Sequence, residues 1–78
     1  MKNDKSLKQK LSKKIGSAIK YYRIKNNISQ ETLAFNTRVD RTYISALEQG
    51  VKCGSLYCLY VISKQLNIEL KDLVDFKI

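Results

Sequence analysis

Between residues 41 and 49, one side of an expected helix carries side chains that suit hydrogen bonding to the edges of DNA bases. The side consists of short or polar residues, namely Arg41, Thr42, Tyr43, Ser45, Ala46 and Gln49. Only Arg41 is charged, whereas a helix face that is merely solvated is more often rich in Lys and Glu. Because a short polar face can approach base edges closely, the pattern favours binding in the major groove.

The sequence offers little to support an enzyme or a metal site. It has no His, no paired acids at a catalytic spacing, no glycine-rich phosphate loop and no nucleophile beside a base. Its two cysteines, Cys53 and Cys58, lack the CxxC spacing and a second pair, which argues against structural zinc. We therefore expect no catalytic residue, no cofactor and no metal, with Cys58 on an apolar helix face and Cys53 in a loop.

Positive charge is concentrated in the first part of the chain. The net charge is +8, of which residues 1–14 hold +5, residues 15–52 hold +3 and residues 53–78 hold none. A basic front and a neutral back suggest one surface that faces a polyanion. Many small proteins are basic for solubility, so charge alone does not separate the two interpretations.

The first ten residues are expected to differ from the rest. Residues 1–10 lack apolar residues at helical spacing and predict a flexible basic arm ahead of a domain over residues 11–78. No apolar run approaches the length of a membrane span, and the lysine-rich start lacks the apolar core of a secretory signal. We therefore expect a cytoplasmic protein with no membrane association.

The remaining chain predicts an all-α fold of five helices. Apolar residues recur every three or four positions, there is no Pro, and there are three Gly. Ser29, Asp40 and Ser55 suit helix N-termini, and Gly50 suits a helix end. The expected helices cover roughly residues 11–25, 30–36, 41–49, 56–66 and 69–75. The apolar face of the fourth is expected to hold Leu56, Leu59, Ile62, Ser63 and Leu66.

The second and third of these helices have the arrangement that a helix-turn-helix requires. Helices that cross at about 90–120° need a small residue where they meet, and Ala34 provides it. Val39 would fill the space under the turn, while Ile44 and Leu47 would anchor one side of the third helix. Its opposite side, between residues 41 and 49, would then remain open.

The stretch from Leu11 to Val74 resembles the phage repressor and Cro type (XRE-like) of helix-turn-helix protein, and it is most similar to restriction–modification controller proteins. The matching residues are Ser29-Gln30-Glu31, Leu33-Ala34, Val39, Arg41, Tyr43-Ile44-Ser45, Glu48, Gly50, Ser55-Leu56 and Leu59. The resemblance implies a repressor-like DNA-binding domain that binds a double-stranded DNA operator and regulates transcription, as activator or repressor.

The resemblance also implies a role for each matched position. Arg41 and Thr42 would contact bases, with Arg41 reaching both guanine acceptors, O6 and N7. Ser45 and Ala46 would lie against base edges. Gln30 would donate to a phosphate and brace the third helix, which is the recognition helix of this family. The DNA backbone or groove rim would be contacted by Tyr43, Gln49 and Lys52. Arg23 and Glu48 match a pair that joins the first and third helices in this family. The implied role of this pair is structural rather than contact with bases.

Two positions depart from the family pattern. Arg38 stands where glycine is usual, because the turn favours a positive φ there. A residue other than glycine costs roughly 1 kcal/mol in that conformation, and Arg38 could add a phosphate contact in return. In the loop before the fourth helix, Cys53-Gly54 replaces the usual Asn-Pro.

A homodimer is expected, because one recognition helix covers only a few base pairs. The neutral part of the chain holds more apolar residues than a small core can easily cover, namely Tyr57, Tyr60, Val61, Leu70, Val74, Phe76 and Ile78. We expect these to form the interface; the alternative is that Phe76 and Ile78 cover the core of the monomer. RNA polymerase is a further candidate partner, through Glu31 on an exposed turn.

Two other functions remain open on the sequence. The chain could be a phage, plasmid or antitoxin-type repressor, which genomic neighbours would distinguish from a controller protein. It could also be a helical module for protein or RNA interaction that does not bind DNA. Such a module would be expected to carry acidic or apolar residues on the side formed by Arg41, Ser45 and Gln49.

Overall fold

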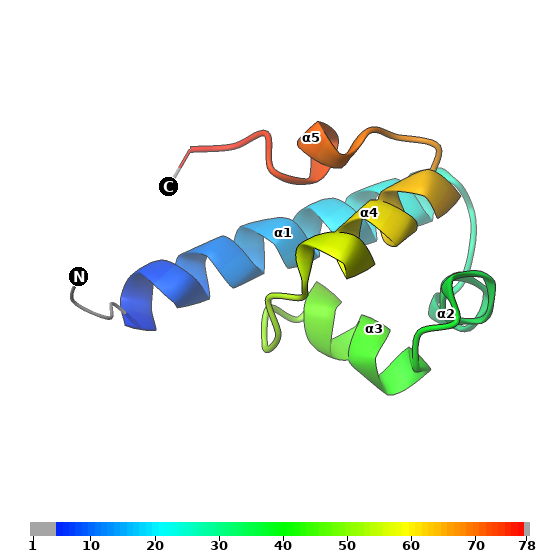
Figure 1. Cartoon of the computed structure of the whole chain (residues 1–78), viewed down its shortest axis with the longest axis horizontal. Helices are drawn as coiled ribbons and strands as arrows, with labels where there is room; N and C mark the ends of the chain where they lie inside the picture. Colours follow the sequence, from blue (N-terminus) through cyan, green and yellow to red (C-terminus); the bar gives the residue numbers. More distant parts are fainter. Residues whose placement is uncertain (1–4, 78) are drawn as a thin grey trace.

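The computed structural model describes residues 5–77, and these residues fold into five helices and contain no strand. The helices are α1 (Lys5–Lys25), α2 (Gln30–Thr37), α3 (Arg41–Glu48), α4 (Leu56–Gln65) and α5 (Leu70–Leu73). The long helix α1 packs against α3 and α5, while α4 packs against α2 and α5 (Figure 1). The predicted all-α, five-helix class is therefore confirmed.

Three of the helices begin at the capping residues that the sequence predicts. The Ser29 hydroxyl accepts from the backbone N–H of Thr32 at 3.0 Å at the start of α2. Asp40 does the same for α3, accepting from the N–H of Thr42 at 3.3 Å, and Ser55 caps α4. Each such cap stabilises its helix by about 1 kcal/mol relative to alanine.

The ends of three helical segments use left-handed backbone at residues other than glycine. Asn27, Arg38 and Asn67 each have φ of 59°, and asparagine tolerates this conformation better than most residues. Arg38 confirms the expected positive φ in the turn between α2 and α3. Its backbone N–H closes α2 by donating to the carbonyls of Ala34 and Phe35.

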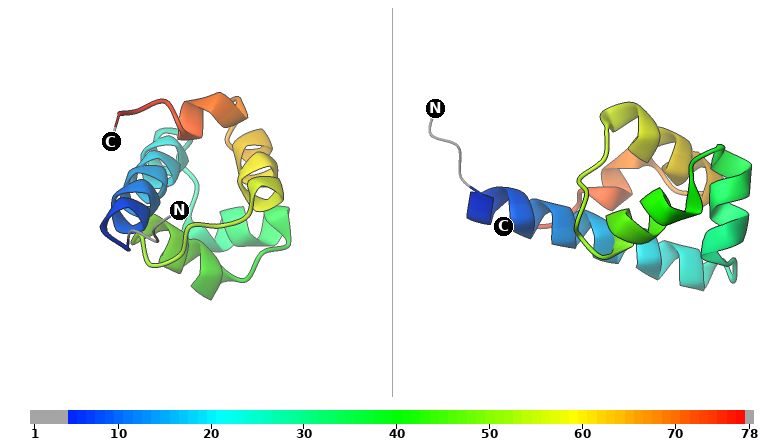
Figure 2. Two further views of the ribbon diagram at one scale, coloured as in Figure 1. Left: turned by 60° about the vertical axis from the view of Figure 1, so that its left-hand side comes forward. Right: turned by 90° about the horizontal axis from the view of Figure 1, so that it is seen from below.

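The start of α1 corrects the expected boundary between arm and domain. The helix begins at Lys5 rather than at Leu11, so residues 5–10 are helical and not a flexible arm. These residues include Lys, Leu and Gln, which favour helices, and no Gly or Pro that would stop a helix once it has formed. In Figure 2 the first turns of α1 extend beyond the other helices. The rest of the expected arm, residues 1–4, lies outside the described residues.

One core is formed between the helices. It consists of Ile15, Ile19, Leu33, Ala34, Ile44, Leu47, Leu59, Ile62, Leu66 and Leu73. Ser63 is buried on the same side of α4, but Leu56 is 72% exposed and does not belong to this face as expected. Leu56 is the first residue of α4, and contact with the core begins one turn later, at Leu59. The fifth helix is also shorter than expected and ends at Leu73.

Gly16 allows α1 to lie directly against the end of α3. A Cβ atom at this position would lie 2.1 Å from the carbonyl oxygen of Leu47 and 2.8 Å from that of Glu48. Both atoms belong to backbone and cannot move aside without shifting α3.

No helix within residues 5–77 combines the length and apolar character needed to cross a membrane.

We expect Gly16→Ala to destabilise the fold, because the added methyl group would force α1 and α3 apart. The free energy of unfolding should fall by about 1–3 kcal/mol, with the melting temperature falling by roughly 4–8 °C per kcal/mol. Thermal unfolding followed by circular dichroism measures this change. Ser17→Ala, at the exposed neighbouring position, is the control. An unchanged melting temperature for Gly16→Ala would contradict the close approach.

Candidate nucleic-acid interface

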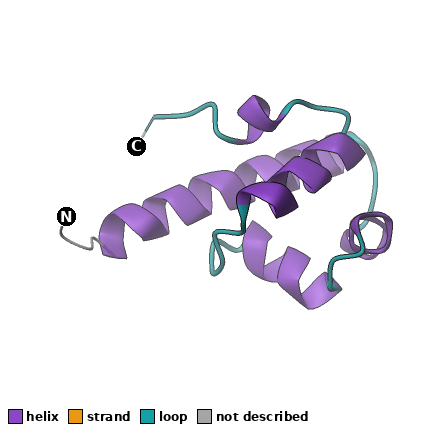
Figure 3. Ribbon diagram, viewed as in Figure 1, coloured by secondary structure: helices purple, strands orange, loops and turns teal. Residues whose placement is uncertain are grey.

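The helices α2 and α3 are joined by the short turn at residues 38–40 (Figure 3). One side of α3 is buried. Ile44 and Leu47 are fully buried, and the small Ala34 is buried on α2. Val39 is partly buried and packs against the core, as expected for the residue under the turn. The predicted helix-turn-helix packing is therefore confirmed, and it fixes which side of α3 faces solvent.

The outer side of α3 is open to solvent along its length. Arg41, Thr42 and Gln49 are exposed, while Tyr43, Ser45 and Ala46 are half-buried. The Gln49 amide donates to the Ser45 hydroxyl at 3.0 Å, so these two side chains lie together on one turn. None of the six residues is tucked into the interior, which is the condition for reaching a DNA groove.

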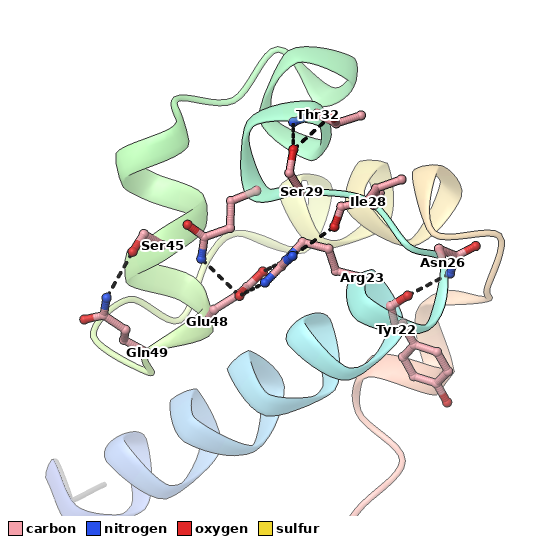
Figure 4. A network of polar contacts seen from close by, with 10 residues as sticks. Tyr22, Arg23, Asn26, Ile28, Ser29, Thr32, Ser45, Glu48 and Gln49 are labelled. Atoms are coloured by element: carbon pink, nitrogen blue, oxygen red, sulfur yellow. Dashed lines mark hydrogen bonds and ion pairs between the residues drawn. The ribbon is translucent and has the colours of Figure 1, made fainter.

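A buried carboxylate joins α3 to the two helices beside it. Glu48 accepts from Arg23 Nε at 2.6 Å and Nη2 at 3.1 Å, and from the Gln30 amide at 3.1 Å. Figure 4 shows Arg23 reaching from α1 towards Glu48 and towards the carbonyl of Ile28, to which it donates at 2.9 Å. The hydrogen bond to Glu48 raises the pKa of Arg23 above its ordinary value. The network thus holds α3 in one rotation about its axis.

This network confirms the expected link between the first and third helices and adds Gln30 to it. Gln30 contacts the recognition helix through Glu48, which agrees with the bracing role that the family resemblance implies. Its contact with phosphate is not tested and remains a prediction. The side chains of Arg23 and Glu48 are only 13% and 3% exposed, so each depends on the other for its charge partner.

We expect Arg23→Ala to destabilise the protein strongly, because it would leave the Glu48 carboxylate buried without its cation. Removing one partner of a buried ion pair costs about 3–5 kcal/mol. Urea unfolding followed by circular dichroism measures the free energy of unfolding. Lys25→Ala, which removes an exposed cation from the same helix, is the control and should have little effect. Equal stability of the two variants would show that the network does not hold α3.

A second ion pair crosses the turn, and this one is exposed. Arg41 Nε lies 3.1 Å from Glu31 Oε2, with the two side chains 55% and 68% exposed. Glu31 lies in the first turn of α2, where its own backbone N–H and then Arg41 lower the pKa of its carboxyl group. The sequence placed Glu31 among the matched family residues but did not predict its pairing with Arg41, because ten residues separate the partners and helical periodicity does not describe contacts across a turn.

Basic side chains flank the recognition helix at both ends. Arg38 is exposed beside a shallow groove at the turn, lined by Ala34, Phe35, Asn36, Val39 and Asp40. Lys52 is exposed directly after α3, and its backbone N–H donates to the carbonyl of Ala46 at 3.3 Å. Lys13 of α1 was missed as a site residue. It lies against Gly50, where a Cβ atom would come within 2.7 Å of Lys13 Cγ.

The residues expected at a dimer interface divide into two groups. Tyr57, Tyr60 and Val74 are exposed, and Val61 is half-buried. Leu70 and Phe76 pack against the core of their own chain, so they contribute only part of their surface elsewhere. This agrees with the alternative expectation for Phe76, while Ile78 lies outside the described residues.

Both cysteines are free and half-buried, and burial raises the pKa of the Cys58 thiol.

Known proteins share both the sequence pattern and the fold. The pattern of the helix-turn-helix family matches residues 19–73. Control protein C.BamHI of Bacillus amyloliquefaciens is 45% identical over 62 residues, which span 78% of this chain and 76% of that protein. The restriction-modification controller protein C.AhdI from Aeromonas hydrophila superimposes with a TM-score of 0.77 at 34% identity, over 80% of this chain and 94% of that one.

A third relative has been solved together with DNA. The controller protein C.Esp1396I, as a tetramer in complex with its natural 35 base-pair operator, has a TM-score of 0.71 and 29% identity. The superposition covers 83% of this chain and 96% of that one. The fold and the open recognition helix therefore define a helix-turn-helix protein, and the chain belongs to that family. These three relatives, C.BamHI, C.AhdI and C.Esp1396I, are control or controller proteins.

Proposed function

We propose that this protein is a transcription regulator that binds operator DNA as a homodimer in the cytoplasm and controls restriction–modification genes. The observation that carries the proposal is the two-sided burial of α3. Ile44 and Leu47 are fully buried, while Arg41, Thr42 and Gln49 on the other side are exposed. An α-helix held in this way fits the major groove of B-DNA with its outer side against the base edges.

The proposed base contacts come from α3, and the proposed phosphate contacts come from its surroundings. Arg41, Thr42, Ser45 and Ala46 lie on the outer side of the helix and would meet base edges. The residues that would meet phosphates or the groove rim are Gln30, Arg38, Tyr43, Gln49 and Lys52, and we propose Lys13 as well because it lies against Gly50. Because phosphate contacts carry no sequence information directly, the two groups predict different outcomes on substitution.

We expect Arg41→Ala to lower the affinity for the operator by about 1–3 kcal/mol and to relax the preference at one position in each half-site. The reason is the loss of a side chain that can contact both guanine acceptors. The operator is first obtained by selection from random DNA with the natural protein. Binding titrations with that duplex and with single-base variants then measure the change.

Lys52→Gln is the matched comparison, because Lys52 lies in the loop after the same helix and would contact only phosphate. Its affinity should fall by a similar factor for every sequence, and the slope of log affinity against log salt should decrease by about 1. Base preference unchanged in Arg41→Ala would contradict the assignment of Arg41 to a base.

A homodimer would place two recognition helices on one face of the DNA. Two-fold dimers bind half-sites about one helical turn, roughly 34 Å, apart. The exposed Tyr57, Tyr60 and Val74 lie in the part of the chain that carries no net charge. Association through this part would leave residues 1–52, which carry the net positive charge, free in both copies to face the same duplex.

We expect Tyr57→Glu combined with Val74→Glu to convert the dimer into a monomer, because each places a charge in the apolar interface. Light scattering at micromolar concentration, without DNA, measures the mass. The control is Phe35→Glu, which also replaces an exposed apolar residue but lies on α2 beside the turn. The interface is assigned wrongly if the double variant remains dimeric, or if Phe35→Glu alone becomes monomeric.

A further inference from the structure

The ion pair between Arg41 and Glu31 uses only part of the arginine side chain. Glu31 Oε2 lies 3.1 Å from Arg41 Nε, the nitrogen nearest the aliphatic stem. Among residues 5–77, Glu31 is the one hydrogen-bond partner of the Arg41 guanidinium. The terminal nitrogens Nη1 and Nη2 therefore remain available. Because a guanidinium is planar and rigid, holding Nε also fixes the direction in which these two nitrogens point.

The direction matters because a guanine in the major groove offers two acceptors, O6 and N7, side by side. An arginine binds them with two parallel N–H groups, and this is the commonest base-specific contact in protein–DNA complexes. A free arginine has many rotamers and loses that freedom on binding. An arginine that is already held by a carboxylate loses less, so a correct base is favoured more strongly over a wrong one.

Glu31 is favoured in its ionised form by two interactions. It lies in the first turn of α2, where its backbone N–H interacts with its own carboxylate, and Arg41 interacts from α3. Both interactions lower the pKa of the carboxyl group, so the carboxylate is ionised at neutral pH and the pair does not act as a pH switch. The adjacent Gln30 is turned the other way and donates to Glu48 at 3.1 Å. Gln30 thus contacts α3 through Glu48, whereas Glu31 contacts it through Arg41.

A carboxylate near DNA has a cost that makes its presence informative. Glu31 is 68% exposed and belongs to the helix that precedes the recognition helix. An anion there would repel phosphates and lower the affinity for every duplex, whatever its sequence. A side chain that weakens general affinity while it aligns a base-contacting arginine would increase discrimination between sequences. These two effects have opposite signs and can be measured separately.

We propose that Glu31 is a positioning residue for base recognition, in which its carboxylate holds Arg41 Nε so that Nη1 and Nη2 face a guanine together. The proposal rests on the function proposed above, because it requires Arg41 to contact DNA. Glu31 itself touches no base. Its effect is on the ratio of affinities between the correct duplex and a duplex that lacks one guanine acceptor.

The test compares two duplexes in binding titrations with the full chain. One is the operator selected from random DNA, and the other carries 7-deazaguanine, which lacks the N7 acceptor, at the position identified with Arg41→Ala. Glu31→Gln should reduce the preference for the natural duplex by about two- to fivefold, the range of an exposed ion pair. Its affinity for a random duplex should be equal or higher. Asp75→Asn, which removes an exposed carboxylate outside the proposed DNA interface, should leave the preference for the natural duplex unchanged.

Further variants separate positioning from net charge and from folding. Glu31→Asp keeps the charge but withdraws it by one methylene, so it should reduce the preference while the affinity for random DNA stays the same. Arg41→Lys removes the planar fork, and adding Glu31→Gln to it should cause no further loss of preference. Thermal unfolding should show the same melting temperature for the Glu31 variants and the natural protein within a few degrees.

The outcomes distinguish this proposal from the function on which it rests. If Arg41→Lys loses the preference for guanine and both Glu31 variants keep it, the positioning role is wrong and the proposed function stands. If Glu31→Gln instead alters the preference at a different base pair, Glu31 contacts a base itself and the positioning role is again wrong. If the natural protein does not prefer its selected duplex over a random one, the proposed function fails, and the positioning role fails with it.

Discussion

The Glu48 carboxylate is the point on which the arrangement of this molecule depends. A buried anion is costly unless donors surround it, and here Arg23 and Gln30 reach it from α1 and α2. Gly16 makes this possible because it lets α1 approach the backbone of α3. Together these contacts allow α3 one orientation about its axis. Which residues of α3 face solvent follows from that orientation.

Two ion pairs involve α3, and they differ in role because one is buried and the other is exposed. The pair of Arg23 and Glu48 is almost fully buried, so its geometry is rigid and its loss would leave an unpaired charge. The pair of Arg41 and Glu31 is largely exposed and contributes little to stability. Because the pair is exposed and uses only Nε, the terminal nitrogens of Arg41 stay open to a base while Glu31 holds Nε, which a buried pair would prevent.

The net charge is unevenly distributed along the chain, and we propose different partners for the two parts. Residues 1–52 hold all of the net positive charge, and residues 53–78 hold none. The neutral part carries the exposed Tyr57 and Val74, which suit contact with a second copy. The basic part surrounds α3, where Lys13 and Lys52 flank the end of the recognition helix. A dimer of this kind can therefore present both recognition helices to one duplex.

The sequence by itself determined the features that depend on residues three or four positions apart. The caps at Ser29, Asp40 and Ser55 and the small residue at the helix crossing were all predictable, because capping and helical periodicity are local. Apart from the link between Arg23 and Glu48, which the family resemblance implied, contacts across a turn or between helices were decided only by the tertiary structure, since they depend on the angle and distance at which helices pack. The pairing of Glu31 with Arg41 is of this kind, because no spacing along one helix describes it.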